Sequence, residues 1–85
     1  MITGAQIRAA RSAIGWSAEK LAAEASVGMR TIMRFEQVDD IPPSRSSTLM
    51  DVKRALEAAG IEFIGTPDDA PGIRIHKRNV DEHKL

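Results

Sequence analysis

Two arginines, Arg30 and Arg34, combine the side-chain type and the spacing that suit contact with nucleic acid. Residues four apart on a helix share one face about one turn apart, so both guanidinium groups can reach into a single groove. Arginine forms bidentate hydrogen bonds with guanine, or with phosphate at the edge of a groove. Met29 and Met33 flank this face, where methionine can contact thymine methyl groups or can instead fill a core. The pattern indicates a helix face suited to the major groove of DNA, with a solvated charged face as the alternative.

A second group of residues, near the start of the preceding predicted helix, could meet the DNA backbone. Ser17 and Lys20 lie there, and the main-chain N–H groups of a first helical turn carry the positive end of the helix dipole, which favours phosphate. Gln37 falls on the same side of its helix as the two arginines when residues are placed about 100° apart. We therefore predict one DNA-contacting set, composed of Arg30, Arg34, Met29, Thr31, Met33, Gln37, Ser17, Lys20 and Gly28.

No arrangement of residues in the sequence predicts catalysis or metal binding. His76 and His83 are the only histidines, cysteine is absent, and no carboxylate spacing around either histidine matches a metal site. The acidic pairs at 39–40 and 68–69 fall in predicted loops, where aspartates usually serve as solvated turn residues. A phosphate-binding glycine loop and a nucleophile with a suitable partner are also lacking. We expect a protein that is not an enzyme and that uses no cofactor and no metal.

The arginines can act together only if their helix is packed against other elements that fix its position. Residues 16–36, WSAEKLAAEASVGMRTIMRFE, predict two short helices joined by a tight turn at residues 25–28. Ser17 caps the first helix, and Gly28 occupies the cap position of the second. Ala22 is small enough to let the second helix cross close to the first.

Apolar residues at helical spacing predict one further helix on each side of this unit. Thr3 and Gln6 form a capping box in front of the first, and Gly15 ends it. After a loop with paired prolines, Ser46 or Ser47 caps the last helix. The predicted buried stripes are Ile7, Ala10 and Ile14 in the first helix and Leu49, Val52, Leu56 and Ala59 in the last.

The C-terminal part of the chain predicts a β-hairpin. Residues 61–65 and 72–76 are rich in β-branched and aromatic side chains and flank a turn-forming segment, TPDDAP. An isolated hairpin is marginal in water, so these strands must pack on the helices or pair with another chain. The predicted organisation is a helical domain over 1–60, a hairpin over 61–76 and a polar tail over 77–85.

Charge and composition permit DNA binding without arguing for it. The net charge is zero, but residues 1–36 hold five basic and three acidic side chains, whereas residues 37–70 hold three basic and seven acidic. Few phosphates can be neutralised at once, so non-specific affinity should be modest. Because cysteine and long apolar runs are absent, we expect a soluble protein of the bacterial cytoplasm with no membrane contact, associated with the nucleoid when bound to DNA.

Residues 5–36 resemble the helix-turn-helix domain of the Cro/C1-type family, also called lambda-repressor-like or XRE. The positions that carry the resemblance are Ile7, Arg8, Arg11, Gly15, Trp16, Ser17, Leu21, Ala22, Val27, Thr31, Ile32, Phe35 and Glu36. The resemblance implies a mainly α fold, a bundle of four helices containing the helix-turn-helix. The C-terminal hairpin lies outside the core pattern of that family.

The family pattern also implies roles for single residues. Arg11 and Glu36 match positions that form an ion pair between the first helix and the end of the third. The chain departs from the pattern at Ala18, where glutamine is usual and contacts DNA. It departs again at Ser26, where a turn glycine is usual, and at Gly28, where a serine or threonine cap is usual. Ser26 would then adopt a left-handed conformation at a cost of about 1 kcal/mol.

These features predict a sequence-specific DNA-binding transcriptional regulator, a repressor, that reads the major groove with helix 29–37. One recognition helix makes too few contacts for selective binding, so we expect a homodimer on a palindromic double-stranded operator. The edge of strand 72–76 could pair with its symmetry mate. The predicted surface for dimerisation or for hairpin docking is formed by Ile61, Phe63, Ile64, Ile73 and Ile75.

Two other functions remain open at this point. The first is a protein-interaction regulator, similar to an antiactivator or an antitoxin, that keeps the fold but binds a protein partner. Zero net charge, Ala18 and the methionines Met29, Met33 and Met50 permit this alternative. The second is an accessory factor that bends DNA with the same residues.

Overall fold

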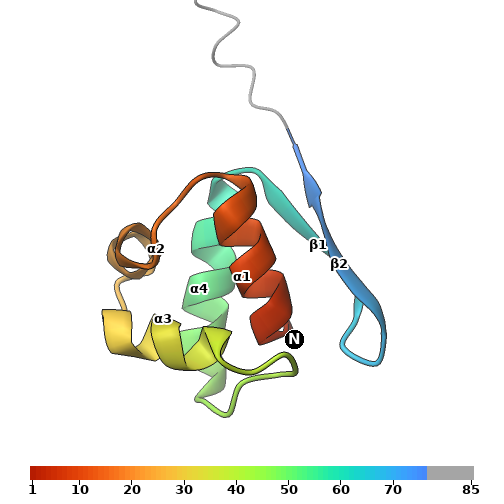
Figure 1. Cartoon of the computed structure of the whole chain (residues 1–85), viewed down its shortest axis with the longest axis horizontal. Helices are drawn as coiled ribbons and strands as arrows, with labels where there is room; N and C mark the ends of the chain where they lie inside the picture. The colour runs from red at the N-terminus through yellow and green to blue at the C-terminus, as the bar shows by residue number, and fades with distance from the viewer. Residues whose placement is uncertain (77–85) are drawn as a thin grey trace, which may run out of the picture.

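The computed structural model describes residues 1–76 as four helices followed by an antiparallel hairpin, which confirms the predicted class and order of elements (Figure 1). The predicted polar tail over 77–85, with His83, lies outside the described residues. The elements are α1 (Gly4–Ala13), α2 (Ala18–Ala25), α3 (Met29–Glu36), α4 (Ser46–Ala58), β1 (Ile61–Thr66) and β2 (Asp69–Ile75). In the view of Figure 1 the hairpin lies on the opposite side of α1 from α2 and α3.

Side-chain caps start the first two helices as predicted. The hydroxyl of Thr3 accepts from the N–H of Gln6 at 3.0 Å, and the Gln6 side chain accepts from the N–H of Thr3 at 2.9 Å. The hydroxyl of Ser17 accepts from the N–H of Lys20 at 3.0 Å, which satisfies one free donor of the first turn of α2.

The prediction that Ser46 or Ser47 caps α4 is wrong. The N-cap is Arg45, whose backbone is extended and whose side chain makes no capping hydrogen bond. Ser46 already has helical conformation, so its hydroxyl lies one position too late to cap. The hydroxyl of Ser44 donates to the main-chain oxygen of Arg45 instead. The first turn of α4 therefore begins without a side-chain acceptor for its free N–H groups.

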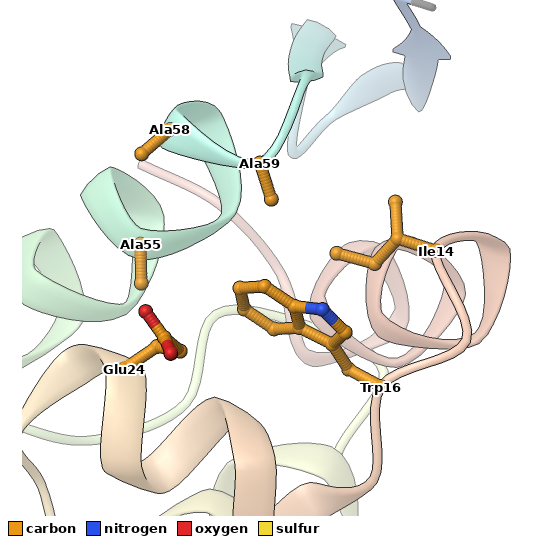
Figure 2. A pocket seen from close by; sticks show the side chains of 6 residues that line it. All are labelled: Ile14, Trp16, Glu24, Ala55, Ala58 and Ala59. Carbon is orange, nitrogen blue, oxygen red and sulfur yellow. The ribbon is translucent and has the colours of Figure 1, made fainter. Parts of the chain in front are cut away.

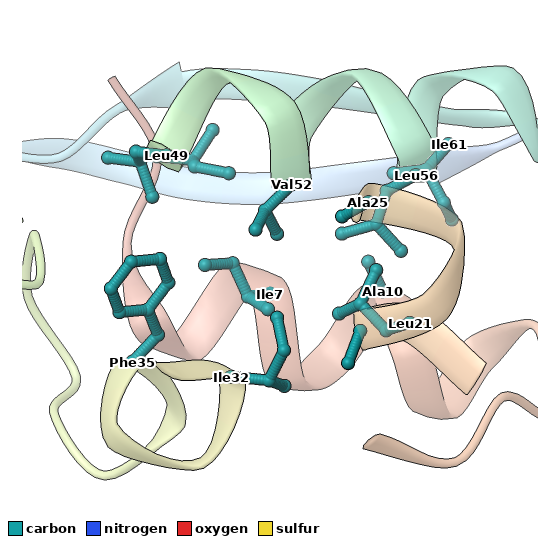
Figure 3. Packing of buried hydrophobic residues seen from close by; sticks show 12 residues of the cluster. Ile7, Ala10, Leu21, Ala25, Ile32, Phe35, Leu49, Val52, Leu56 and Ile61 are labelled. Atoms are coloured by element: carbon teal, nitrogen blue, oxygen red, sulfur yellow. The ribbon is translucent and has the colours of Figure 1, made fainter. Parts of the chain in front are cut away.

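The core is one apolar cluster to which every helix contributes (Figure 3). The predicted stripes of α1 and α4 are buried except at their ends, where Ile14 and Ala59 are half-buried. Small residues of α2 let this short helix pack against both α3 and α4. The cluster consists of Ile2, Ile7, Ala10, Leu21, Ala22, Ala25, Ile32, Phe35, Leu49, Val52, Leu56 and Ile61.

Two backbone positions fix the path of the helices around this core. Ser26, with φ 59° and ψ 42°, has the predicted left-handed conformation at the end of α2. Gly4 was not singled out by the sequence, yet a Cβ there would collide with the main-chain oxygens of Phe35 and Val38. Glycine at position 4 thus lets the start of α1 approach the end of α3.

The hairpin is longer and its turn tighter than predicted. Strands of six and seven residues replace the predicted five-residue strands, and only residues 67–68 form the turn. Gly65 and Ala70 both have positive φ, and the ladder shifts register between Ile64 and Thr66. This bulge lets the chain continue pairing through residues expected to belong to the loop.

The hairpin docks on the helices through one face. Ile61 is 3% exposed and belongs to the core, and Phe63 and Ile73 pack against that core. Of the two roles predicted for this surface, dimerisation and hairpin docking, Ile61 therefore serves docking, since this chain's own helices bury it. Ile75 is 53% exposed and Ile64 is half-buried. Within residues 1–76, no helix has the length and apolarity needed to cross a membrane.

Candidate nucleic-acid interface

Helix α3 is divided sharply into a buried and an exposed face. Ile32 and Phe35 are fully buried in the core. On the opposite side, Met29 and Met33 are 46% and 50% exposed although methionine is apolar. The exposed side chains enclose a shallow depression of about 530 Å³, lined by Met29, Arg30, Met33, Arg34 and Gln37. All five belong to the predicted DNA-contacting set, so the structure brings this part of the set together.

The arginines of this depression are free of carboxylates. Within residues 1–76, the basic side chains without a carboxylate inside 4.0 Å are Arg30, Arg34 and Arg45. The guanidinium carbon of Arg34 lies 5.9 Å from the centre of the Phe35 ring, a cation–π distance. An unpaired arginine can bind an anion without first breaking an ion pair, so these three side chains are the most available cations of the described chain.

Arg45 is a functional candidate that the sequence prediction missed. It is exposed and occupies the N-cap of α4, and in Figure 1 the start of α4 lies at the same end of the domain as α3. The sequence offered no reason to select Arg45, because the segment 37–70 around it is acidic as a whole. The signal becomes visible only when ion pairs are assigned, since the other basic residues of the segment, Lys53 and Arg54, pair with carboxylates of α4.

The predicted backbone-contacting residues of α2 already have partners. The Lys20 ammonium lies 2.9 Å from a carboxylate oxygen of Glu24 and 5.6 Å from the centre of the Trp16 ring. The Ser17 hydroxyl accepts the capping hydrogen bond but still has its own proton to donate. An exposed i,i+4 ion pair contributes little energy, so Lys20 can exchange Glu24 for another anion at small cost.

Gly28 and Thr31 complete the predicted set at the start of α3. Gly28 is the N-cap, has no side-chain capping bond, and has ordinary extended dihedral angles. A Cβ at this position would meet nothing within 4 Å. Thr31 is half-buried on the first turn. The N-terminus of α3 is therefore open, and its free N–H groups have no side-chain acceptor within residues 1–76.

Two arginines of α1 hold the other end of α3 in place. Arg11 binds the Glu36 carboxylate in a bidentate manner, with Nε and Nη2 lying 2.7 and 2.8 Å from its two oxygens, which confirms the predicted ion pair. The hydrogen bond to Glu36 raises the pKa of Arg11 above its ordinary value. Arg11 also donates to the main-chain oxygen of Trp16 at 2.8 Å. One side chain thereby joins α1, the α1–α2 connection and α3.

Arg8 adds a second tie that the sequence prediction did not include. It donates to the main-chain oxygen of Glu36 and, at 2.8 Å, to a carboxylate oxygen of Asp39. The carbonyl at the C-terminus of α3 is one of the orphan acceptors of a helix end, and a cation there also suits the helix dipole. Together with Arg11, this contact fixes the orientation in which α3 presents its outer face.

Another depression, of about 360 Å³, lies around Trp16 (Figure 2). The indole reaches from the α1–α2 connection toward the alanines at the C-terminal end of α4, and Ile14 lies on its other side. Glu24 supplies the acidic group of its rim and is already paired with Lys20. The depression therefore combines small apolar side chains with a neutralised carboxylate and does not share the free cations of the α3 face.

No model of a protein family matches the sequence, and a search of curated proteins found no match.

Proposed function

We propose that this protein is a sequence-specific DNA-binding transcriptional regulator, a repressor, in which α2 and α3 form a helix-turn-helix of the lambda-repressor-like kind. In this proposal α3 enters the major groove with Arg30 and Arg34 facing the base edges. The observation that carries the proposal is the exposed face of α3, where two arginines one turn apart have no carboxylate partner within residues 1–76.

Three further features support this function. The resemblance of residues 5–36 to Cro/C1-type domains gives the helix pair a precedent. Arg8 and Arg11 hold the C-terminal end of α3 through Glu36, which suits an element that must place guanidinium groups accurately. Arg45 and the open N-terminus of α3 offer positive groups to phosphates beside the groove.

Selectivity in this proposal requires two copies of the chain. A good bidentate arginine–guanine contact discriminates by about 1–3 kcal/mol, so two arginines give too little for one site among many. A two-fold dimer doubles the contacts and matches a palindromic site whose halves lie one helical turn apart. The regulator is therefore proposed to bind its operator as a homodimer.

The test begins with selection of bound sequences from a random pool of double-stranded DNA. We expect a palindromic consensus with guanine in each half-site. Fluorescence anisotropy on this consensus should then show at least a 100-fold loss of affinity for the Arg30→Ala, Arg34→Ala variant. The matched control is Lys53→Ala, Arg54→Ala, which removes the same charge from α4 and should change affinity by less than about threefold because those groups contact no phosphate. Equal losses in both variants, or no enrichment at all, would refute base reading by α3.

The methionines of the α3 face favour a second candidate function, that of a regulator which binds a protein. Met29 and Met33 are about half exposed and line the depression, and methionine is common on adaptable protein-binding surfaces. Salt separates the two functions. Binding to DNA should weaken steeply between about 50 and 200 mM salt, whereas binding of a protein to a methionine-rich surface should change little over that range.

A further inference from the structure

Methionine is a surface residue throughout this chain. Six large apolar residues are exposed within residues 1–76, and four of them are Met1, Met29, Met33 and Met50, which are all the methionines of the sequence. The core cluster is built from isoleucine, leucine, valine, alanine and phenylalanine. The flexible thioether is therefore not used here to fill gaps in the interior, which is its usual structural role.

Two of these thioethers share the outer face of α3 with the free arginines. Met29 and Met33 are four residues apart, so they lie on one side of the helix, and both line the depression of about 530 Å³. Met33 follows Arg30 by three residues, a spacing at which helical side chains are neighbours. Within residues 1–76, the guanidinium groups of Arg30 and Arg34 donate no hydrogen bond to the protein and have no carboxylate within 4.0 Å. The depression thus places oxidisable sulfur beside unused hydrogen-bond donors.

Thioether sulfur reacts with hydroperoxides in a single two-electron step. The sulfur attacks one oxygen of the peroxide, an S–O bond forms as the O–O bond breaks, and an alcohol leaves, or water when the oxidant is hydrogen peroxide. The apolar side chain becomes a sulfoxide, whose oxygen is polar and accepts hydrogen bonds. Cysteine, which would compete for the oxidant, is absent from the chain. A sulfoxide reductase reverses the step, since two thiols supply the electrons, form a disulfide and release the oxygen as water.

We propose that Met29 and Met33 form a reversible oxidation site that closes the α3 face. Their sulfoxide oxygens accept hydrogen bonds from the guanidinium groups of Arg30 and Arg34, and they replace the apolar part of the face with polar groups. The arginines are then held by the chain itself and no longer meet an outside ligand. For a repressor, the consequence is release of the operator in the presence of hydroperoxides. That consequence rests on the proposed function, whereas the masking of the arginines does not.

The fold itself should survive this oxidation. Ile32 and Phe35 anchor α3 in the core from the other side of the helix, and no methionine belongs to the core cluster. The half-exposed positions of Met29 and Met33 leave room for an added oxygen in water. Oxidation should therefore leave the urea unfolding midpoint unchanged, and a fall in the midpoint would mean that it damages the fold instead of masking the arginines.

The first test observes the arginines directly and needs no DNA. The full chain, labelled with ¹⁵N, is treated with hydrogen peroxide, and peptide mass spectrometry locates the sulfoxides. Oxidation should shift the Nε–H signals of Arg30 and Arg34. The signal of Arg45, which also has no carboxylate within 4.0 Å but lies at the N-cap of α4, should stay in place. Signals of Arg30 and Arg34 that do not move when the methionines beside them are oxidised would overturn the proposal.

Substitution by leucine assigns the shift to particular sulfurs. Leucine keeps the apolar volume of methionine but cannot be oxidised. Met29→Leu, Met33→Leu should abolish the shift of both arginine signals. Met50→Leu is the matched control, since it removes an exposed thioether of α4 that does not line the depression, and it should retain the shift. A shift that persists without Met29 and Met33 would contradict the assignment.

The second test measures affinity for the selected DNA by fluorescence anisotropy. Each protein is compared with itself before and after peroxide, so differences in starting affinity cancel. Oxidation should weaken binding by about tenfold or more in the wild type and in Met50→Leu, and by less than about threefold in Met29→Leu, Met33→Leu. A sulfoxide reductase with dithiothreitol should restore the affinity of the oxidised wild type. Equal losses in all three proteins, or no loss in the wild type, would contradict the switch.

The two proposals fail in different ways. Arginine signals that shift on oxidation in a protein that binds no DNA leave the oxidation site standing and remove the DNA-binding function. Binding to palindromic DNA that oxidation leaves unchanged, with arginine signals that do not move, leaves the function standing and removes the switch.

Discussion

The side-chain amide of Gln6 joins the helices to the hairpin by donating from Nε2 to the main-chain oxygen of Gly72, 2.9 Å away. The same nitrogen lies 3.3 Å from the main-chain oxygen of Ile64. Its Oε1 accepts from the N–H of Thr3, so one buried residue closes the capping box of α1 and receives the hairpin. A single side chain therefore contributes both to the start of α1 and to the placement of β2.

The substitution Gln6→Glu should separate these two roles. The introduced carboxylate retains the acceptor of the capping box, but it loses the donor and lies beside two main-chain oxygens. Leaving buried acceptors facing a charge costs about 2–4 kcal/mol of unfolding free energy. Urea unfolding at pH 7 measures this loss, and Thr3→Ala, which removes only the cap hydroxyl, should cost about 1 kcal/mol. Equal losses in both variants would mean that the bond to the hairpin contributes nothing.

The Arg11–Glu36 pair should behave as a partly buried, bidentate ion pair. Glu36→Gln removes the charge partner of a side chain that is 21% exposed, and we expect a loss of about 2 kcal/mol in unfolding free energy. Arg11→Met, Glu36→Leu should recover part of that loss, because no unpaired charge remains. A double-mutant cycle from urea unfolding should give a coupling energy of about 1–3 kcal/mol. A coupling energy of zero would show that the ion pair with Glu36 adds no stability, and that Arg11 stabilises the fold only through its hydrogen bond to the main-chain oxygen of Trp16.

Local sequence signals predicted the helices well because their causes are local. The capping box needs only Thr3 and Gln6 three residues apart, and the burial of α3 follows from Ile32 and Phe35 at helical spacing. The same reasoning could not predict the bond from Gln6 to Gly72, which joins residues 66 positions apart in the chain. Long-range contacts of this kind are decided by packing and leave no periodic trace in the sequence.

The errors of prediction have a common origin in backbone conformation. The hairpin turn was predicted too long because Ala70, a residue that rarely has positive φ, adopts it and lets β2 continue to Asp69. Serines 46 and 47 were predicted as caps from residue type alone, whereas the extended residue before α4 is Arg45. The value of Arg45 as a free cation was hidden for a related reason, because ion pairing depends on which carboxylates the fold brings near.

The loss of stability at acidic pH should come in part from protonation of Glu62. The hydrogen bond from His76, at 2.7 Å, followed by the charge of Arg74, holds the pKa of Glu62 below its ordinary value near 4.5. Because the folded state lowers this pKa, Glu62 stabilises the fold above the unfolded pKa, and that contribution is lost as pH falls through the folded pKa. Urea midpoints between pH 6 and pH 3 should fall less steeply for Glu62→Gln than for the wild type. An identical slope would contradict the assignment.

Ser26→Gly should stabilise the chain. Ser26 has φ 59°, a region that disfavours residues with a Cβ by about 1–2 kcal/mol, and glycine occupies it freely. Glycine also loses more backbone entropy on folding, so the expected net gain in unfolding free energy is about 0.5–1 kcal/mol. Ser12→Gly is the matched control, since Ser12 is an exposed residue inside α1, where glycine should cost about 0.5 kcal/mol. A loss of stability in Ser26→Gly would show that its side chain makes a contact beyond the turn.

Gly28→Ser should improve both the fold and the proposed DNA binding. Gly28 is the N-cap of α3 with φ −70° and ψ 148°, and a Cβ there meets nothing within 4 Å, so serine enters without strain. Its hydroxyl can accept from a free N–H of the first turn, which adds a few tenths of a kcal/mol to the unfolding free energy. The same hydroxyl can donate to a phosphate beside the groove. We expect affinity for the selected DNA to rise about two- to fivefold, which corresponds to one neutral hydrogen bond of about 0.5–1 kcal/mol.

Gly28→Ala separates the two effects, because alanine has no hydroxyl to accept or donate a hydrogen bond. This variant should lower stability and leave DNA affinity unimproved. If alanine and serine raise affinity equally, the gain comes from helix rigidity and the hydroxyl contacts no phosphate.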